Sequence, residues 1–340
     1  MIHSARYEVV MATYNGATFV EAQLSSILCQ QPAPVRILIR DDHSTDTTVA
    51  LLERFAASSG VPIVVEAGCQ TLGVTANFNH VLMQTREPYV FLADQDDIWD
   101  ADHVGRLLQK MEHLEGRWGH HGPLLVHSDL RLISGQGKFL AQSFFRRQCL
   151  NPAHVGWVDL LFQNVVTGCT VLVNRACLES ALPVPPEAIL HDGWLALVGA
   201  GLGHVCFLNE ATVSYRQHGH NVVGAGGLLA LFQRRWQVVL GSSRDAESFL
   251  LPFLRQADVF LKRYRQQLDL RPESSGRKRD PRQLAQALGQ LRHPSLVVRF
   301  HSAWLLGLRK HRWWRSLGLY WCLWRCRFRS ASDWLGGTPR

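Results

Sequence analysis

Residues 88–100 read PYVFLADQDDIWD, and this stretch decides the fold class that we expect for the chain. Its apolar part, Tyr89–Leu92, is short and rich in strand-forming side chains, which is typical of a buried parallel strand. Three carboxylates follow within four positions, at Asp94, Asp96 and Asp97. A helical pattern comes next, so the stretch predicts a strand, an acidic loop and a helix in succession.

The crowding of the acidic loop has two explanations. Carboxylates this close raise each other's pKa by repulsion unless a cation or water separates them. Mg²⁺ and Mn²⁺ prefer oxygen ligands, so either ion could be held here. A solvated turn in which Asp97 or Asp100 caps the next helix explains the same residues. The loop by itself leaves both interpretations open.

The composition fits a globular protein with a sizeable core, because 46% of the 340 residues are hydrophobic and 19% are charged. One large domain with an appendage is the natural expectation at this length. The formal net charge is +8, and Arg residues crowd towards the C-terminal end. A basic tail of this kind suits an anionic surface, either lipid or nucleic acid.

The cysteines and the apolar runs bear on localisation. The eight Cys form no CxxC pair and no zinc spacing, which is typical of reduced thiols in the cytoplasm. The N-terminal MIHSARYEVVMATYNG lacks the apolar core of a signal peptide, and the longest apolar run, LALVGAGLGHVCFL, is too short to span a bilayer. We therefore expect a cytoplasmic protein without a membrane span.

Strand and helix patterns alternate through the first hundred residues. Strand-like runs at 7–13, 35–42, 62–68 and 89–94 are separated by helical patterns, which predicts βαβ units and a mostly parallel sheet. Ligands bind such sheets beyond the carboxyl ends of the strands. Because Asp42 and the acidic loop both follow strands, we expect them to face one crevice.

Further polar residues punctuate the second half. Gly168 could let the backbone approach a ligand, although a β-turn or bulge explains it equally well. Asp192 stands at an expected helix start, where it is either an N-cap or a general base. The loop YRQHGHN supplies Arg216, His218 and His220 as a phosphate-binding lid beside an anionic, metal-linked site.

The C-terminal part, residues 226–340, is expected to form a separate helical region. A polar connector spans about residues 265–283, and the final segment reads as a basic, Trp-rich amphipathic helix. Such a helix suits peripheral contact with the inner face of an anionic membrane. Packing of that helix on the catalytic body is the other interpretation, and the sequence does not choose between them.

Seven motifs together resemble a known family. MATYNG, RDDHSTDTT, LGVTANFN, LADQDDIW, TGCT, LHDGW and YRQHGHN are similar, in this order, to the inverting glycosyltransferases of family 2, and most of all to their bacterial rhamnosyltransferase branch. The resemblance covers about residues 7–225. It implies a GT-A type α/β sandwich with a mostly parallel central sheet, a catalytic domain over residues 1–225, and a nucleotide-sugar donor.

The resemblance also implies roles for single residues on the donor side. The first motif would contact the nucleoside, Asp42 would hydrogen-bond the base, and Asp94 would lie near the ribose. Gly168 and Arg216 from the second half of the chain are added to these. The expected nucleotide-sugar-binding residues are thus Thr13, Tyr14, Asn15, Asp42, Asp94, Gly168 and Arg216.

Metal and catalytic roles follow from the same resemblance. Asp96 would be the metal ligand of the family's DxD motif, which reads DQD here, and His218 a further metal or diphosphate ligand. Asp192 would be the catalytic base, although its motif reads His-Asp where many members have Glu-Asp. The expected cofactor is Mg²⁺ or Mn²⁺.

The implied reaction is the inverting transfer of a hexose in surface-polysaccharide or lipopolysaccharide biosynthesis. We expect a dTDP- or UDP-linked donor, first of all dTDP-rhamnose, a glycan or lipid-linked glycan acceptor, and no nucleic acid. A metal-dependent nucleotidyltransferase is the nearest alternative, but MATYNGATF lacks a Gly-rich basic loop for a triphosphate. A nucleic-acid-binding protein acting through the Arg- and Trp-rich end is the alternative from another class.

Overall fold

The computed structural model describes residues 5–154, 156–218, 243–270, 280–291, 293, 295–306, 320 and 324. These residues fall into two compact units. The first comprises the described residues up to 154 together with 165–186 and 190–218, and the second comprises 156–164, 187–189 and the described residues from 243 onwards. The domain boundary expected near residue 225 lies outside the described residues and stays a prediction.

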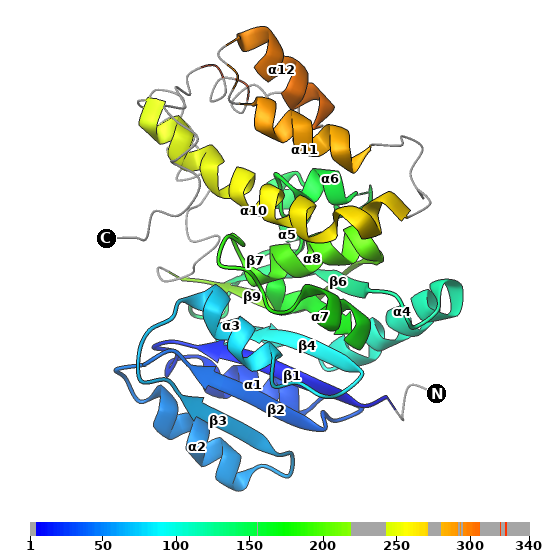
Figure 1. The fold of residues 1–340 in the computed structure, drawn as a ribbon. Coiled ribbons are helices and arrows are strands. Elements are labelled where there is room, and N and C mark those ends of the chain that lie inside the picture. Colours follow the sequence, from blue (N-terminus) through cyan, green and yellow to red (C-terminus); the bar gives the residue numbers. More distant parts are fainter. Residues whose placement is uncertain are drawn as a thin grey trace. The chain divides into compact units, whose positions relative to one another are not determined.

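The first unit is built on four parallel strands (Figure 1). β1 lies at the centre with β2 on one side and β4 on the other, and β3 forms the edge beyond β2. In β1, β2 and β4 the buried Val, Ile, Leu and Phe side chains are those of strands covered on both faces, whereas the edge strand β3 is only partly buried. The four strands are β1 (Tyr7–Thr13), β2 (Arg36–Asp41), β3 (Ile63–Ala67) and β4 (Tyr89–Asp94).

Five further strands complete a mixed sheet in the order β3-β2-β1-β4-β8-β6-β9-β5, with β7 paired to β6. Strand β8 is antiparallel to both of its neighbours, and β5 and β7 also pair in antiparallel fashion. The other six strands run in one direction, which confirms the expected mostly parallel α/β sheet. The added strands are β5 (Ile98–Trp99), β6 (Leu124–Ser134), β7 (Phe139–Ala141), β8 (Val171–Asn174) and β9 (His204–Gln217).

Helices cover both faces of this sheet. α1 (Val20–Leu28), α2 (Thr48–Ser58) and α4 (His103–Trp118) bury apolar side chains in one core together with alternate residues of β1. The opposite face carries α3 (Val74–Leu82), α7 (Arg175–Ala181) and α8 (His191–Leu202). Helix α8 is buried almost all round, as expected for a helix with apolar side chains on every side. A short helix, α5 (Phe144–Gln148), packs beside β6.

The second unit is helical. It contains α6 (Trp157–Leu160), α10 (Ser243–Leu270), α11 (Pro281–Gln290) and α12 (Leu296–Leu305). Residues 265–270, which we expected in the polar connector, belong to α10. The expected Trp-rich helix was the segment 301–329, of which residues 301–305 belong to α12 and only 306, 320 and 324 are described beyond it. None of the described helices is both long enough and apolar enough to cross a bilayer.

Candidate active site

The two acidic strand ends lie on either side of β1. In the register of the sheet, Asp41 of β2 is opposite Thr13, and Asp94 of β4 is opposite Ala12. The Thr13 hydroxyl donates to Asp41 Oδ2 at 2.8 Å. Neighbouring strands are about 4.8 Å apart, so β2 and β4 are separated by roughly 10 Å. Both acidic ends therefore lie at one edge of the sheet, while the expectation that they face one crevice stays a prediction.

The Asp42 carboxylate binds the loop that precedes α3. Its Oδ1 accepts the backbone N–H of Leu72 and its Oδ2 that of Gly73, both at 2.8 Å, and Arg40 Nη1 lies 3.1 Å from Oδ1. Gly73 has a φ of 85°, a left-handed conformation that glycine adopts without strain. The expected contact between Asp42 and a nucleobase stays a prediction. In the structure the Asp42 carboxylate is bound to the loop before α3.

Two side chains hold the turn after β1. Asn15 has a φ of 48°, and its Oδ1 accepts the N–H of Thr45 at 2.9 Å. Gln95, the middle residue of the DQD sequence, accepts the Tyr14 N–H at 2.8 Å and donates to the Tyr14 carbonyl at 3.0 Å. The Tyr14 residue itself is 50% exposed. The backbone of this turn is therefore fixed while the Tyr14 residue remains open to solvent.

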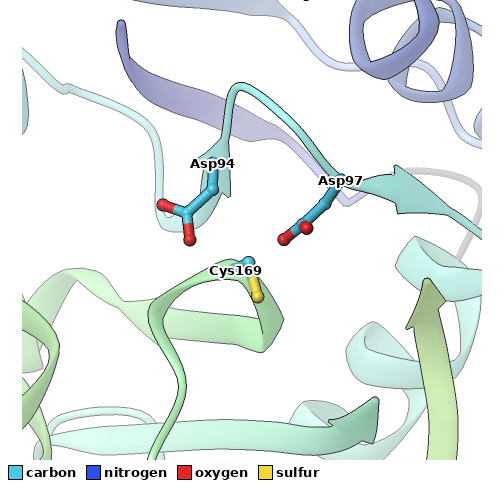
Figure 2. Close-up of side chains that lie close together, drawn as sticks. All are labelled: Asp94, Asp97 and Cys169. Carbon is cyan, nitrogen blue, oxygen red and sulfur yellow. The ribbon is translucent and has the colours of Figure 1, made fainter. Parts of the chain in front are cut away.

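The acidic loop places two carboxyl groups against a thiol. Ligand atoms of Asp94, Asp97 and Cys169 all lie within 4.8 Å of one another, and Figure 2 shows the two carboxyl groups turned towards the same space above Cys169. Burial and the neighbouring Asp96 and Asp192 carboxylates raise the pKa of Asp94 to about 8. Burial, Asp96 and Asp94 raise the pKa of Asp97 well above its ordinary value.

Asp97 has a different role from the helix cap that one interpretation of the sequence assigned to it. Its Oδ1 accepts the backbone N–H of Arg216 at 3.0 Å. Helix α4 starts after Asp102, and its N-terminus has no side-chain cap from Asp97 or Asp100. The capping interpretation is thus wrong, because the buried carboxylate is already bound to the end of β9.

Asp96 points the other way and meets His218. Oδ2 of Asp96 lies 2.7 Å from His218 Nε2. The His218 ring stacks on the Phe19 ring with centroids 4.8 Å apart. The Arg216 guanidinium carbon lies 4.8 Å from the centroid of the Phe19 ring. Arg216 also donates from Nε to the Asp96 carbonyl at 3.0 Å. The residues expected at the metal and in the lid are therefore assembled around one aromatic side chain.

Asp192 occupies the first turn of α8 and is 7% exposed. Its Oδ2 accepts the N–H of Gly168 at 3.0 Å, and its Oδ1 accepts the N–H of Gly193 at 2.6 Å. Gly168, expected to bring backbone close to a ligand, thus presents its N–H to Asp192. His191 is buried and stacks on Phe78 at 3.8 Å between ring centroids, and burial lowers the pKa of His191 to about 3. His191 is therefore neutral and adds no charge beside Asp192.

The donor set fits a divalent ion. Asp96 and His218 offer an oxygen and a nitrogen within one ion's reach. Carboxylate oxygen is a ligand that Mg²⁺ and Mn²⁺ prefer, and imidazole nitrogen binds many divalent ions. The metal roles of Asp96 and His218 remain predictions, and His220 lies outside the described residues.

Three members of this site were not predicted from the sequence. Cys169 stands in the quoted TGCT motif, Gln95 in DQD, and Phe19 just before α1. The motifs flagged the first two positions, but no local pattern showed that Cys169 would face the acidic loop. Phe19 carries no signal at all, because its partners lie about two hundred residues away in the chain.

Comparison with known proteins finds glycosyltransferases. The sequence model described as "Glycosyl transferase family 2" matches residues 8–116. The chain is 26% identical over 231 residues to "dTDP-rhamnosyl transferase RfbG" from Shigella flexneri, covering 63% of this chain and 74% of that protein. It also matches uncharacterized mycobacterial proteins, such as Rv1520 of Mycobacterium tuberculosis, and spans 59% of their length.

Two solved structures resemble the fold. One is Staphylococcus aureus TarS 1–349 in complex with UDP-GlcNAc, at 14% identity and a TM-score of 0.51 over 89% of this chain and 88% of TarS. The other is the mannosyltransferase PcManGT from Pyrobaculum calidifontis in complex with GDP-Man and Mn²⁺, at 16% identity and a TM-score of 0.51 over 94% of this chain and 85% of PcManGT. At this identity the likeness concerns the GT-A-like fold alone. The family match is confined to residues 8–116, which contain β2 to β5 and the acidic loop and which fit the model of glycosyl transferase family 2.

Proposed function

We propose that this family 2 glycosyltransferase moves a hexose from a nucleotide sugar to a hydroxyl of a surface-glycan acceptor, with inversion at the anomeric carbon and Asp192 as the general base. The observation that carries the proposal is the setting of Asp192. Backbone N–H groups of Gly168 and Gly193 hold its carboxylate at the edge where β1 and β4 end, and its charge acts on Asp94. A base must be held in place to act in a transition state.

The reaction proceeds as a single displacement. Asp192 takes the proton of the acceptor hydroxyl while the hydroxyl oxygen attacks the anomeric carbon. The bond from that carbon to the phosphate oxygen breaks, and the nucleoside diphosphate leaves with the electron pair. Attack from the face opposite the phosphate inverts the anomeric centre, and no covalent sugar–protein intermediate forms.

The chain's own residues prepare this step. Gln95 and Asn15 fix the turn that would meet the nucleoside, and the neutral His191 keeps a second charge away from the base. A bound Mg²⁺ or Mn²⁺, held by Asp96 and His218, would supply positive charge for the leaving diphosphate. Arg216 supports the acidic loop through the Asp96 carbonyl and the Asp97 carboxylate.

L-Rhamnose from a dTDP-linked donor is the proposed sugar, because RfbG is named a dTDP-rhamnosyl transferase and the quoted motifs resemble that branch. A UDP-linked sugar is the second choice. The proposed acceptor is a growing surface glycan, which a lipid carrier at the inner membrane face would present to the basic C-terminal segment. No contact among the described residues favours a nucleotidyltransferase or a nucleic-acid-binding protein.

The test is a screen of nucleotide sugars for metal-dependent release of nucleoside diphosphate. Asp192→Asn should bind the donor like the wild type, yet turn over about 10²- to 10⁴-fold more slowly because the proton acceptor is lost. Asp96→Ala should lose the metal-dependent activity. Asp102→Asn, at the N-terminus of α4, is the matched control and should retain wild-type rates. Wild-type transfer by Asp192→Asn would show that another group is the base.

A further inference from the structure

Strand β9 bulges at Asn209 and Glu210. Its pairing with β6 jumps from Leu208 to Ala211, so the two residues between them stand outside the ladder. A bulge re-aims side chains and is common beside active sites. Here it brings two polar side chains to the wall of a cavity beside the sheet.

The bulge lies at the level of the catalytic edge. Val126 of β6 and Phe91 of β4 are both opposite Leu172 of β8, and the residues three positions further along are Asp129 and Asp94. Asp129 pairs directly beside the bulge. It is therefore level with Asp94 and about 10 Å from it, because two strand spacings separate β6 from β4.

Asp129 also faces the side of the sheet that carries the proposed base. Residues four positions apart on a strand share a face. Leu125, four residues before Asp129, has its Cβ 3.4 Å from the Cβ position of Gly199 in α8, and Asp192 lies in the first turn of that helix. A cavity lined by Asp129 therefore opens on the same face as Asp192.

Two adjoining cavities occupy this place, with volumes of about 360 and 280 Å³. Asp129, Ser143, Arg146 and Asn209 line both of them, so the two form one continuous space, the bulge cleft. The Ser143 hydroxyl donates to Asp129 and accepts the N–H of Arg146 at 3.0 Å, which fixes the start of α5 in this wall. Pockets for small ligands begin at about 300 Å³, so the cleft is large enough for a sugar residue.

The charges of the first cavity balance, because three Arg and three carboxylates line it. Arg131 forms a two-pronged ion pair with Asp100, with one N–O distance of 2.8 Å, and Arg106 pairs with Glu210 at 2.7 Å. An entering phosphate or carboxylate would be repelled by the carboxylates and would find only Arg146 free of such a pair. The cleft therefore fits an uncharged ligand.

The remaining lining fits the hydroxyl groups of a sugar. No hydrogen bond or ion pair ties the side chains of Gln142, Arg146 and Asn209 to other described residues. Amide and guanidinium groups carry neighbouring donors and acceptors, or two donors, that match adjacent hydroxyl groups on a ring. Phe145 and Phe207 of the second cavity, with ring centroids 5.3 Å apart, add apolar surface for the C–H face of that ring.

We propose that the bulge cleft binds an uncharged sugar residue of the acceptor glycan, beyond the residue whose hydroxyl reacts at Asp192. The role of this glycan as acceptor rests on the proposed function. By holding a second residue, the cleft orients the acceptor without contact to the nucleotide sugar. It thus selects which glycan is extended.

Saturation-transfer NMR of the full-length protein, without any nucleotide sugar, tests the cleft directly. The probes are the methyl glycosides of L-rhamnose, D-mannose, D-glucose, D-galactose and N-acetyl-D-glucosamine, with that of D-glucuronic acid as the anionic comparison. We expect at least one neutral glycoside to bind at millimolar concentration, and the glucuronide to bind more weakly than it. Failure of every neutral glycoside to bind, or preference for the glucuronide, would overturn the proposal.

Variants then locate the bound sugar. Asn209→Ala and Arg146→Ala should each weaken binding roughly two- to tenfold, the effect of one lost hydrogen bond. Arg147→Ala is the matched control and should bind like the wild type, because Arg147 is an exposed neighbour in α5 that lines neither cavity. Binding that is unchanged in both Asn209→Ala and Arg146→Ala would show that the sugar sits elsewhere, and the proposal would fail.

Kinetics separate this proposal from the proposed function. With an active donor and acceptor, Asn209→Ala should raise the KM for the acceptor and leave the KM for the donor unchanged. An equal rise in both KM values would contradict a subsite for the acceptor alone. The NMR measurements contain no transfer step, so their failure would leave the proposed transfer intact. Wild-type transfer by Asp192→Asn would remove the proposed base and leave the bulge cleft intact.

Discussion

Gly16→Ala should weaken the turn after β1, because an added Cβ would lie 2.5 Å from Gln95 Cδ and overlap the side-chain amide. The backbone φ of Gly16 lies outside the left-handed region, so alanine itself would be unstrained there. The Gln95 side chain can rotate away, but it then loses its two hydrogen bonds to Tyr14. At about 0.5–1.5 kcal/mol for each bond, the substitution should cost about 1–3 kcal/mol of unfolding free energy.

The effect of Gly16→Ala on the unfolding free energy should change sign when Gln95 is replaced by alanine. In Gln95→Ala the amide is absent, so the new methyl group of Gly16→Ala displaces nothing from that side chain. Replacing glycine by alanine then restricts the unfolded chain and stabilises the protein by about 0.4–1 kcal/mol. The double-mutant cycle should therefore give a coupling energy of about 1.4–4 kcal/mol between the two positions.

Urea denaturation of the four proteins, followed by circular dichroism, measures this coupling. Gly60→Ala is the matched control, because nothing lies within 4 Å of a Cβ at that position. Its effect should be the same with and without Gln95. Equal effects of Gly16→Ala in both backgrounds would refute the idea that the Gln95 amide holds the turn after β1. We also expect Gln95→Ala to raise the KM for the donor more than it lowers kcat.

Two further predictions concern stability. Burial lowers the pKa of His127 to about 3. Below about pH 6.5 the unfolded chain therefore binds a proton that the folded chain excludes, and the free energy of unfolding decreases as the pH is lowered. His127→Leu should therefore lose about 2 kcal/mol less than the wild type between pH 7.5 and pH 5, measured by urea denaturation; equal losses would contradict this. Gly203→Ala should cost more than about 3 kcal/mol or prevent folding, because its Cβ would overlap the Pro123 carbonyl and lie 2.9 Å from Pro123 Cα. The α4 control Gly116→Ala, with open space around it, should gain about 0.5–1 kcal/mol, and thermal melts that rank the two variants alike would contradict this.

Local patterns were sufficient for the first half of the sheet. Each of the strands β1 to β4 is a short apolar run, and a helical pattern separates each from the next, so their parallel direction followed from the rules for βαβ units. The shared edge of the two acidic ends followed from the same rules. Strand β8 did not, because a short apolar run carries no information about which strands it will join or in which direction.

Local sequence patterns also did not predict which partners Asp96 and Asp97 of the acidic loop would bind. Asp96 and Asp97 are adjacent in sequence, yet one meets the imidazole of His218 and the other the backbone of Arg216. Both partners lie about 120 residues further along the chain. The conformation of the loop sends the two side chains to different places, and only the position of β9 determines which neighbour each one finds.

The position of β8 limits how the chain can be shortened. The matched family segment ends at residue 116, whereas the outer edge of β4 is paired with residues 172–174 of β8. A fragment cut at residue 116 would expose that edge with unpaired N–H and C=O groups, which is a template for aggregation. It would also lack the β9 amide that binds Asp97. The limits of the family match are therefore the wrong guide for expressing the first unit alone, because that unit needs the chain through β9.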